Sequence, residues 1–447
     1  MKYGYYKEKW IKLLSAKRFV DDDSKVYLKE PAPLEGRSPF EADIGRAIFS
    51  QPFRRLAGKT QVHPFASVDY IHNRLTHSIE ASHVSRALGR SIAMFIAKER
   101  GDISGDDAVR VIGWICQVAG LMHDIGNPPY GHAGEDAIRA WAVQNEKALK
   151  EICGGKVADD FMYFDGNAQA FRMASRPGLR ETCYFRLTSA ALGAMAKYPY
   201  YTRSSNGKMG KSAAFSCEEK IFDAVWKELG LRKNERHPLS YITEAADDIC
   251  YRINDFEDAV LMGLLDEDGV KEMLMDGMSF DLQCSLKQKR ASLPRVRALT
   301  IGFLIEEFAN VFKANYETIM DGKFKKDLKS RIGDKWGGVL ARIKEKYDLI
   351  FSERKKVVTE IGSFGQIASV LDKYMSLLKE MSSRGGGLRK YESLSFLSQR
   401  LITLAWGGRC YYEMNANRPM DWWGHAVLDF VVGMTDEYLH KCATEFL

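Results

Sequence analysis

Apolar residues in this chain recur at the spacing of an α-helix, and the strict alternation of a half-buried strand is scarce. One stretch carries the helical pattern at Ile79, His83, Leu88, Ile92, Phe95 and Ile96. Prolines, which interrupt helices, number only 12 in 447 residues. We therefore predict an all-α fold. A chain of this length can bury a large core without disulfides.

The composition is that of a globular protein without a membrane segment. Hydrophobic residues make up 45% and charged residues 28%, which excludes a mainly disordered chain. The longest uncharged apolar-rich run, residues 111–122, is shorter than the ~18 residues that cross a bilayer, and the charged N-terminus lacks the apolar stretch of a signal peptide. Eight scattered cysteines without a C-x-x-C pair favour a reducing compartment, so we expect a cytoplasmic protein.

The chain divides by composition into four segments. An N-terminal arm spans residues 1–40, and a helical core spans 41–265. Residues 266–390 are more charged, with KQKRASLPRVR and KFKKDLKSR, and end in the glycine-rich SSRGGGLRK. A last helical segment covers 391–447. The third segment is either an insertion or a continuation of one large helical domain. The net charge of +6 suits an anionic substrate if it is concentrated in a cleft.

A histidine and aspartate set indicates a metal site. His123 and Asp124 end an apolar helical run, and the following IGNPP must break the helix. A buried His–Asp pair is costly unless a charge compensates it, and a divalent metal ion would do so. His77 near the start of one helical pattern, and Asp247 or its neighbour Asp248 in another, complete the set. Two imidazoles and two carboxylates suit Mn, Fe, Mg, Ni or Zn. An HD dipeptide or a single histidine alone is more often structural.

His132 and Glu135 form a second pair with catalytic potential. Their i and i+3 spacing places them on one helix face. A carboxylate beside an imidazole orients it and raises its pKa, which suits a general acid at a phosphoester leaving group. The alternative is a surface His–Glu pair. Gly131 and Gly134 flank the pair, and we expect them to leave room for substrate.

Six ordered motifs between about residues 40 and 260 carry a family resemblance. They are FEADIGRAIFSQPFRRLAGKTQV, NRLTHSIE, HDIGNPPYGHAGE, FDGNAQAFR, AKYPYY and EAADDICYRINDFEDA, and DFVVGMTDEY follows near the C-terminus. Together they resemble the deoxynucleoside triphosphate triphosphohydrolases of the HD superfamily, the bacterial dGTPase type. Residues 266–425 show little that matches. The resemblance implies an HD-domain catalytic core over 41–265 with an additional C-terminal helical region.

The resemblance also implies roles for individual residues. The ligands of a divalent metal ion (Mn, Mg or another transition metal) would be His77, His123, Asp124 and Asp247. His132 would protonate the leaving group at the α-phosphate, with Glu135 holding it. Triphosphate contacts would come from Arg74, Lys197, Tyr198 and, on a looser match, Lys220, with Asn167 near the site. Gln61 would face the deoxyribose, Tyr251 would pack on the sugar, and Asp255 would accept a hydrogen bond from its 3′-hydroxyl.

The implied reaction converts a dNTP, with dGTP as the family default, to a deoxynucleoside and tripolyphosphate. Family members commonly form homo-oligomers such as hexamers, and some respond to single-stranded DNA. One alternative is another HD-superfamily phosphohydrolase, a 5′-nucleotidase or phosphodiesterase. Another is a nucleotide- or single-stranded-DNA-binding regulator, whose candidate basic residues are Lys287, Lys289, Arg290, Arg295, Arg297, Lys323, Lys325, Lys326, Lys329 and Arg331. A solvated charged face is the simpler interpretation of those residues.

Overall fold

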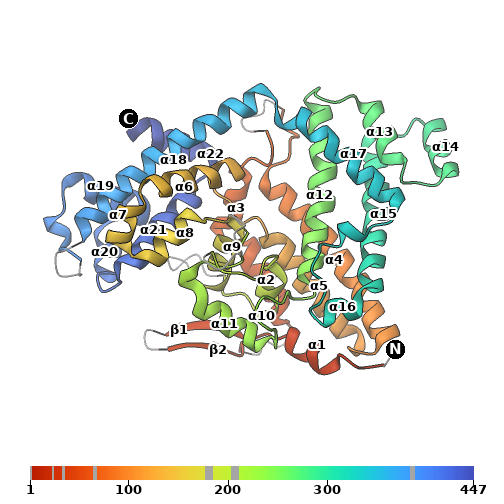
Figure 1. Ribbon diagram of the computed structural model, residues 1–447, viewed down its shortest axis with the longest axis horizontal. Coiled ribbons are helices and arrows are strands. Elements are labelled where there is room, and N and C mark those ends of the chain that lie inside the picture. Colours follow the sequence, from red (N-terminus) through yellow and green to blue (C-terminus); the bar gives the residue numbers. More distant parts are fainter. Residues whose placement is uncertain are drawn as a thin grey trace.

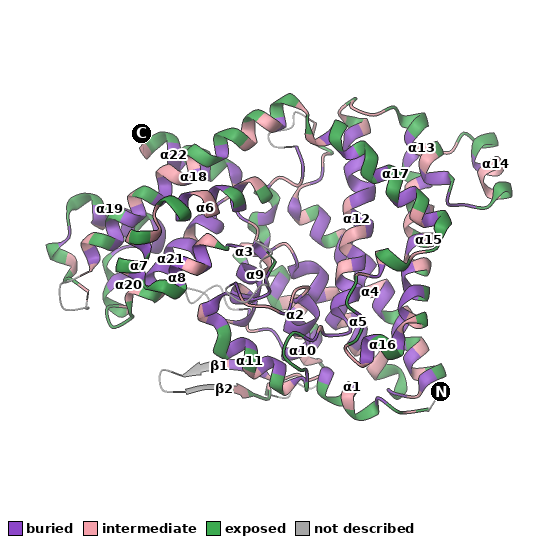
Figure 2. Cartoon of the chain, in the orientation of Figure 1, coloured by how far each residue is buried: buried purple, intermediate pink, exposed green. Residues whose placement is uncertain are grey.

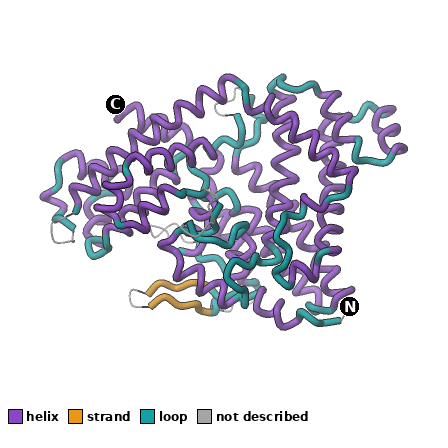
Figure 3. The backbone as a smooth tube through the Cα atoms, in the orientation of Figure 1, coloured by secondary structure: helices purple, strands orange, loops and turns teal. Residues whose placement is uncertain are grey.

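A computed structural model describes residues 3–22, 25–32, 36–63, 68–176, 185–202, 211–382 and 388–446. Within these ranges the chain forms 22 α-helices and one two-stranded antiparallel sheet (Figures 1 and 3), which confirms the predicted all-α class. The hairpin of β1 (Arg18–Asp22) and β2 (Lys25–Lys29) lies at the lower edge of the molecule and is the departure from that prediction. Cys183 and residues 383–387 of the glycine-rich segment lie outside the described residues.

The helices vary from one turn to seven or eight turns. Up to residue 261 they are α1 (Lys7–Leu13), α2 (Pro39–Ile48), α3 (Gln51–Arg55), α4 (Arg74–Phe95), α5 (Gly105–Met122), α6 (His132–Gln144), α7 (Glu146–Cys153), α8 (Gly155–Met162), α9 (Gly166–Ser175), α10 (Ser189–Met195), α11 (Glu219–Glu228) and α12 (Ser240–Leu261). Beyond it they are α13 (Glu267–Met275), α14 (Phe280–Gln288), α15 (Leu293–Ala314), α16 (Tyr316–Met320), α17 (Asp334–Phe351), α18 (Arg354–Met381), α19 (Phe396–Trp406), α20 (Arg409–Met414), α21 (Met420–Val432) and α22 (Asp436–Phe446). No helix in the described part of the chain has the length and hydropathy of a bilayer-crossing segment.

The long helices α4, α5 and α12 pack side by side at the centre of the molecule (Figure 1). Gly120 of α5 permits a close crossing, because a Cβ there would lie 2.7 Å from the Cα of Ser82 in α4. The helix predicted from the spacing in this region is confirmed as α4, but Ile79 and His83 are exposed and do not belong to its buried face. The buried side of α4 instead contains His77, Ala81, Val84, Leu88 and Ile92.

Two hydrophobic clusters make up the core of the described chain (Figure 2). The larger joins α1, α4, α5, α10, α12, α13, α15 and α17. The smaller joins α6, α7 and α8 to α18, α19, α21 and α22, with α18 packed against α6, α21 and α22. Helices of residues 266–351 therefore share a core with the N-terminal half. The predicted four-segment partition stays a prediction.

The aromatic side chains near the C-terminus belong to the smaller cluster. Trp423, Tyr412 and Tyr411 are buried, as expected for core residues. A polar contact also joins this region to α8, because the carboxylate of Asp160 accepts a hydrogen bond from Nε2 of His425 at 3.1 Å. The cysteines among the described residues are unpaired.

His72 attaches the start of α4 to α12. Its backbone N–H and its Nδ1 contact the carboxylate of Asp258 at 3.1 and 2.7 Å, and its Nε2 lies 3.5 Å from Glu80. Burial alone would lower the pKa of His72, but the hydrogen bonds to Asp258 and Glu80 outweigh it and raise the pKa to about 10. The side chain of Asn73 then caps α4 by accepting from the N–H groups of Leu75 and Thr76.

The His72 contact predicts a pH-dependent contribution to stability. Because the folded pKa of about 10 lies above the unfolded value of about 6.5, the stabilisation is complete below about pH 6.5 and is lost as the pH rises through about 10. We expect His72→Gln to lower the free energy of unfolding by at least ~2 kcal/mol at the acidic end of this window and by much less at its alkaline end. Urea unfolding at both pH values measures this. The exposed-site variant His83→Gln is the control, and an equal loss at both pH values would contradict the prediction.

Candidate metal centre and catalytic site

Three ligand atoms from three different helical segments meet in the core. His77 lies in the first turn of α4, His123 directly follows α5, and Asp247 lies in α12. The Nε2 atoms of the two histidines are 3.2 Å apart, and they lie 3.2 and 3.3 Å from Oδ1 of Asp247. Both histidines are buried. The packing of α4, α5 and α12 thus assembles three of the four predicted ligands into one cluster.

The chemistry of these three donors fits a divalent metal ion. Nδ1 of His123 lies 2.7 Å from the carbonyl oxygen of Gly120, to which its N–H donates, so that Nε2 presents a lone pair to the cluster. A second imidazole nitrogen and a carboxylate oxygen at 3.2–3.3 Å add electron density at the same point. Buried ligand atoms that carry lone pairs are stabilised by a cation. A set of nitrogen and oxygen ligands suits a transition metal or Mg.

Asp124 and Asp248 border the cluster in different ways. Oδ1 of Asp124 lies 3.5 Å from Nε2 of His123, and its carboxylate accepts hydrogen bonds from Arg74 at 2.6 Å and Asn127 at 2.7 Å. Burial alone would raise the pKa of Asp124, but His123 and Arg74 outweigh it and lower the pKa. Asp248 instead forms an ion pair with Lys329 at 2.9 Å. Of the two adjacent aspartates, Asp247 is therefore the one beside the imidazoles.

A cavity of about 370 Å³ opens beside this cluster. The predicted site residues that line it are Gln61, Arg74, His123, Asp124, His132, Glu135, Asn167, Lys197, Tyr198, Asp247 and Tyr251. Nζ of Lys197 forms an ion pair with Oδ2 of Asp247. Burial opposes the charge on Lys197, but Asp247 outweighs it and raises the pKa of the ammonium group. The amide of Asn167 donates to Oδ1 of Asp165 at 2.9 Å. The cavity therefore combines fixed cations with the candidate metal ligands.

The His132–Glu135 pair has the geometry of an oriented imidazole. Nδ1 of His132 lies 3.0 Å from Oε2 of Glu135, and Oε1 of Glu135 accepts the backbone N–H of Gly166 at 2.7 Å. Glu135 is buried, whereas the side chain of His132 is 89% exposed. The hydrogen bond to Glu135 raises the pKa of His132. An exposed ring held at one nitrogen leaves the other nitrogen available to a ligand.

The two glycines beside this pair do not leave room for substrate, contrary to the expectation from sequence. Gly131 has φ of +58°, and a Cβ there would lie 2.3 Å from Nη2 of Arg74. A Cβ on Gly134 would lie 2.0 Å from the carbonyl oxygen of Pro129. Both positions are instead filled by neighbouring parts of the protein, and Gly131 allows Arg74 to reach Asp124.

Three predicted residues are not among the residues that line the cavity: His77, which belongs to the buried donor cluster, Lys220 and Asp255. Lys220 is exposed on α11 and is not among the lining residues, so the structure does not support its looser match. Asp255 is buried on α12, one turn beyond Tyr251, and its two carboxylate oxygens have no hydrogen-bond partner among the described residues. Burial and the nearby Asp258 raise the pKa of Asp255.

Several lining residues were not predicted. Lys356, Thr359 and Glu360 reach the cavity from α18, and Lys211 lies 5.0 Å from the ring of Tyr198. Nothing in the sequence around Lys356 matched a motif, so tertiary packing alone brings it here. Asp165 lies in the motif FDGNAQAFR and Tyr130 lies in HDIGNPPYGHAGE, so the motifs themselves were a signal for both residues.

The basic residues considered for nucleic-acid binding are partly neutralised. Lys323 pairs with Asp321 at 2.8 Å, Lys287 with Glu272 at 3.3 Å, and Arg297 with Glu257. Lys329 pairs with Asp248, as described above. These ion pairs favour the interpretation of this region as a charged face.

Comparison with known proteins places this chain in a family. No family model matches the chain. It is similar to a deoxyguanosinetriphosphate triphosphohydrolase-like protein of Pseudomonas aeruginosa (strain LESB58), with 34% identity over 92% of this chain and 93% of the relative. A protein of the same description from Listeria innocua is 31% identical over 96% and 97%. A deoxyguanosinetriphosphate triphosphohydrolase of Yersinia pestis (strain Pestoides F) is 30% identical over 76% and 77%. With this identity along nearly its whole length, the chain belongs to the deoxyguanosinetriphosphate triphosphohydrolase-like family.

Proposed function

We propose that this protein hydrolyses deoxynucleoside triphosphates to a deoxynucleoside and tripolyphosphate with the help of a divalent metal ion. The observation that carries the proposal is one cavity lined by both halves of a catalytic apparatus. His123 and Asp247 of the buried donor cluster and the oriented His132–Glu135 pair all face it. The names of the relatives make dGTP the first substrate to test.

The cations of the cavity suit a polyanionic substrate. Arg74, Lys197, Lys211 and Lys356 line it. Arg74 uses Nη1 to hold Asp124, while its buried Nε has no hydrogen-bond partner among the described residues. A guanidinium N–H that lacks a protein acceptor is suited to a phosphate oxygen. Lys197 remains charged because Asp247 raises its pKa. We infer that these groups bind the triphosphate.

The metal ion would be held by His77, His123 and Asp247, with Asp124 beside them. When bound, a divalent ion such as Mn or Mg supplies Lewis-acid stabilisation of phosphate charge and lowers the pKa of a water molecule. Arg74 and Asn127 fix the orientation of Asp124 through hydrogen bonds of 2.6 and 2.7 Å.

His132 would supply the proton for the departing 5′-oxygen. Its pKa is raised by the hydrogen bond to Glu135, so the ring is more often protonated near neutral pH than a free histidine. Glu135 acts as a positioning residue, because the backbone N–H of Gly166 fixes its other oxygen. The released 5′-hydroxyl would belong to the deoxynucleoside, and all three phosphates would remain joined.

Sugar contacts are assigned to three polar side chains in or near the cavity. Oε1 of Gln61 is buried without a partner among the described residues, and Tyr251 lines the cavity one helical turn from Asp247. The unpartnered carboxylate of Asp255 lies one further turn along α12. We propose that these side chains contact the deoxyribose. A homo-oligomer such as a hexamer, single-stranded DNA as a partner and a cytoplasmic location stay predictions.

Product analysis tests the proposed reaction. We expect incubation with each dNTP and NTP in the presence of Mn²⁺ or Mg²⁺ to give a deoxynucleoside and tripolyphosphate, with dNTPs turned over faster than NTPs. Anion-exchange and reversed-phase chromatography resolve these products. Monophosphate with pyrophosphate, or stepwise release of orthophosphate, would instead indicate another HD-superfamily phosphohydrolase. Binding of nucleotide without turnover under all these conditions would favour the regulator.

Replacement of His132 separates catalysis from metal binding. We expect His132→Ala to lower kcat by about 10²-fold or more, because the leaving oxygen loses its proton donor. Bound metal, measured by plasma mass spectrometry, should stay at the wild-type level. Asp136→Ala is the matched control, since Asp136 is exposed on the same helix and pairs with Arg139. Parallel loss of metal and activity in His132→Ala would contradict its assignment as proton donor.

Replacement of His123 tests the metal site directly. We expect His123→Ala to abolish both high-affinity Mn²⁺ binding and turnover, because it removes one of the three convergent donors. Calorimetric titration of the metal-free protein with Mn²⁺ gives the affinity, and circular dichroism checks folding. His83→Ala, at an exposed histidine on α4, controls for incidental metal binding. Unchanged Mn²⁺ affinity in His123→Ala would overturn the metal assignment.

A further inference from the structure

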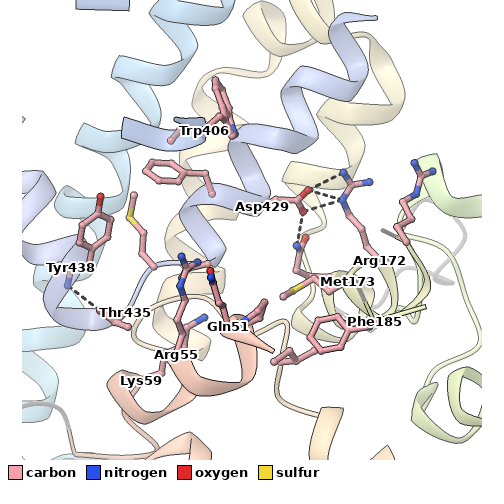
Figure 4. Close-up of a pocket in the computed structure, with 18 of the residues that line it drawn as sticks. Gln51, Arg55, Lys59, Arg172, Met173, Phe185, Trp406, Asp429, Thr435 and Tyr438 are labelled. Atoms are coloured by element: carbon pink, nitrogen blue, oxygen red, sulfur yellow. Dashed lines mark hydrogen bonds and ion pairs between the residues drawn. The ribbon is translucent and has the colours of Figure 1, made fainter. Parts of the chain in front are cut away.

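A second cavity, of about 580 Å³, is lined by residues that include Lys59, Arg172, Trp406 and Asp429 (Figure 4). Its walls come from α3, α9, α19, α21 and the start of α22. Its size falls within the range of small-molecule sites, roughly 300–1,000 Å³. The proposed dNTP reaction does not use it.

Three chain segments separate this cavity from the proposed active site. Lys59 lines the second cavity, whereas the next residues, Thr60 and Gln61, line the first. Ile125 faces the second cavity from between Asp124 and Asn127, which face the first. In α9, Asn167 lines the first cavity and Gln169 lines the second. The two cavities are therefore distinct and lie back to back.

The floor of the second cavity holds a buried lysine that has no carboxylate partner among the described residues. Lys59 is 3% exposed, and its Nζ donates to the carbonyl oxygens of Asn127 and Val432, both at 2.6 Å. Among the described residues no carboxylate lies within ion-pair distance of it. Burial lowers the pKa of Lys59 to about 7 in spite of Asp436. An ammonium group has three donors, so one remains for a ligand.

Arg55 adds a second cation one helical turn earlier, and Figure 4 shows it beside Lys59. It is exposed, and its Nη1 donates to the carbonyl oxygen of Gly433 at 3.1 Å. Arg172, on the opposite wall, is neutralised by Asp429 and Glu218. Arg55 and Lys59 are therefore the basic lining residues that have no carboxylate partner within the described part of the chain, and a bound anion would favour the protonated form of Lys59.

The wall also carries apolar and aromatic side chains, and two of its hydrogen-bonding atoms have no partner among the described residues. Trp406, Phe430, Met434 and Tyr438 line it. Nε1 of Trp406 and Oε1 of Gln169 are buried, and within the described part of the chain neither has a hydrogen-bond partner. Because buried donors and acceptors are normally paired, these atoms indicate a ligand that carries polar groups on an apolar body.

We propose that this cavity binds a small organic anion with a flat apolar body. Its acidic group contacts Lys59 and Arg55, and its body packs against Trp406 and Phe430. Such a ligand supplies the anion that the buried lysine lacks and the partners that Trp406 and Gln169 lack. The site is independent of the proposed hydrolysis, so its test uses binding and not turnover.

Two fluorescent probes of the same shape test the proposal on the full-length protein. 8-Anilinonaphthalene-1-sulfonate carries one negative charge, and N-phenyl-1-naphthylamine is its uncharged counterpart. We expect the wild-type protein to bind one equivalent of the anionic probe about tenfold more tightly than the neutral one. Arg55→Gln should weaken the anionic probe about tenfold and leave the Kd of the neutral probe unchanged. Because Arg55 is exposed, this variant should fold normally.

Matched variants locate the probe. Arg54→Gln removes the neighbouring exposed cation on α3, which does not line the cavity, and should leave both affinities unchanged. Lys211→Gln removes an exposed cation of the active-site cavity and should also have no effect. Equal weakening by Arg54→Gln and Arg55→Gln would overturn the proposal in favour of general surface charge. Weakening by Lys211→Gln alone would overturn it by placing the probe in the other cavity, as would equal affinity for the two probes in the wild type.

Discussion

Two imidazole nitrogens and a carboxylate oxygen lie 3.2–3.3 Å apart where α4, α5 and α12 meet, within the larger hydrophobic cluster. Such groups are costly to bury without a compensating charge. The neighbouring cations meet part of this need, since Lys197 pairs with Asp247 and Arg74 with Asp124. Other contacts hold the same three helices together. Gly120 permits the close crossing of α5 on α4, and His72 joins the start of α4 to α12.

A single wall of protein separates two cavities of different chemistry. On one side are carboxylates, imidazoles and several ammonium and guanidinium groups; on the other are aromatic rings with two cations at the floor. The wall is held by short contacts between loops, because Lys59 donates to the carbonyl of Asn127 and the amide of Asn127 donates to Asp124. The same loop thus orients the carboxylate of Asp124 beside the His77, His123 and Asp247 cluster and lines the second cavity through Ile125.

The helical class and most of the candidate site could be predicted from sequence, because helical periodicity and ordered motifs are local properties. What escaped prediction depends on contacts between distant segments. Lys356 carries no motif and enters the cavity only because α18 passes over it. Lys220 has other lysines nearby in the sequence, and residue spacing alone does not tell which of them faces the cavity. The sequence does not show that the space beside Gly131 is occupied by Arg74 and is therefore not open to substrate. The β1–β2 hairpin is short and charged, so its alternation is weak.

Helix α18 has a consequence for the synthesis of this protein. Its first turns supply Lys356, Thr359 and Glu360 to the cavity beside the donor cluster, and its later turns, from Ile367 onward, pack in the smaller hydrophobic cluster. That cluster is completed by residues as late as Cys442 of α22. On the ribosome, His77 and His123 are therefore made long before the helix that roofs their cavity can be anchored. The cavity can be covered only after helices α21 and α22 have left the exit tunnel, long after its first residues have been made.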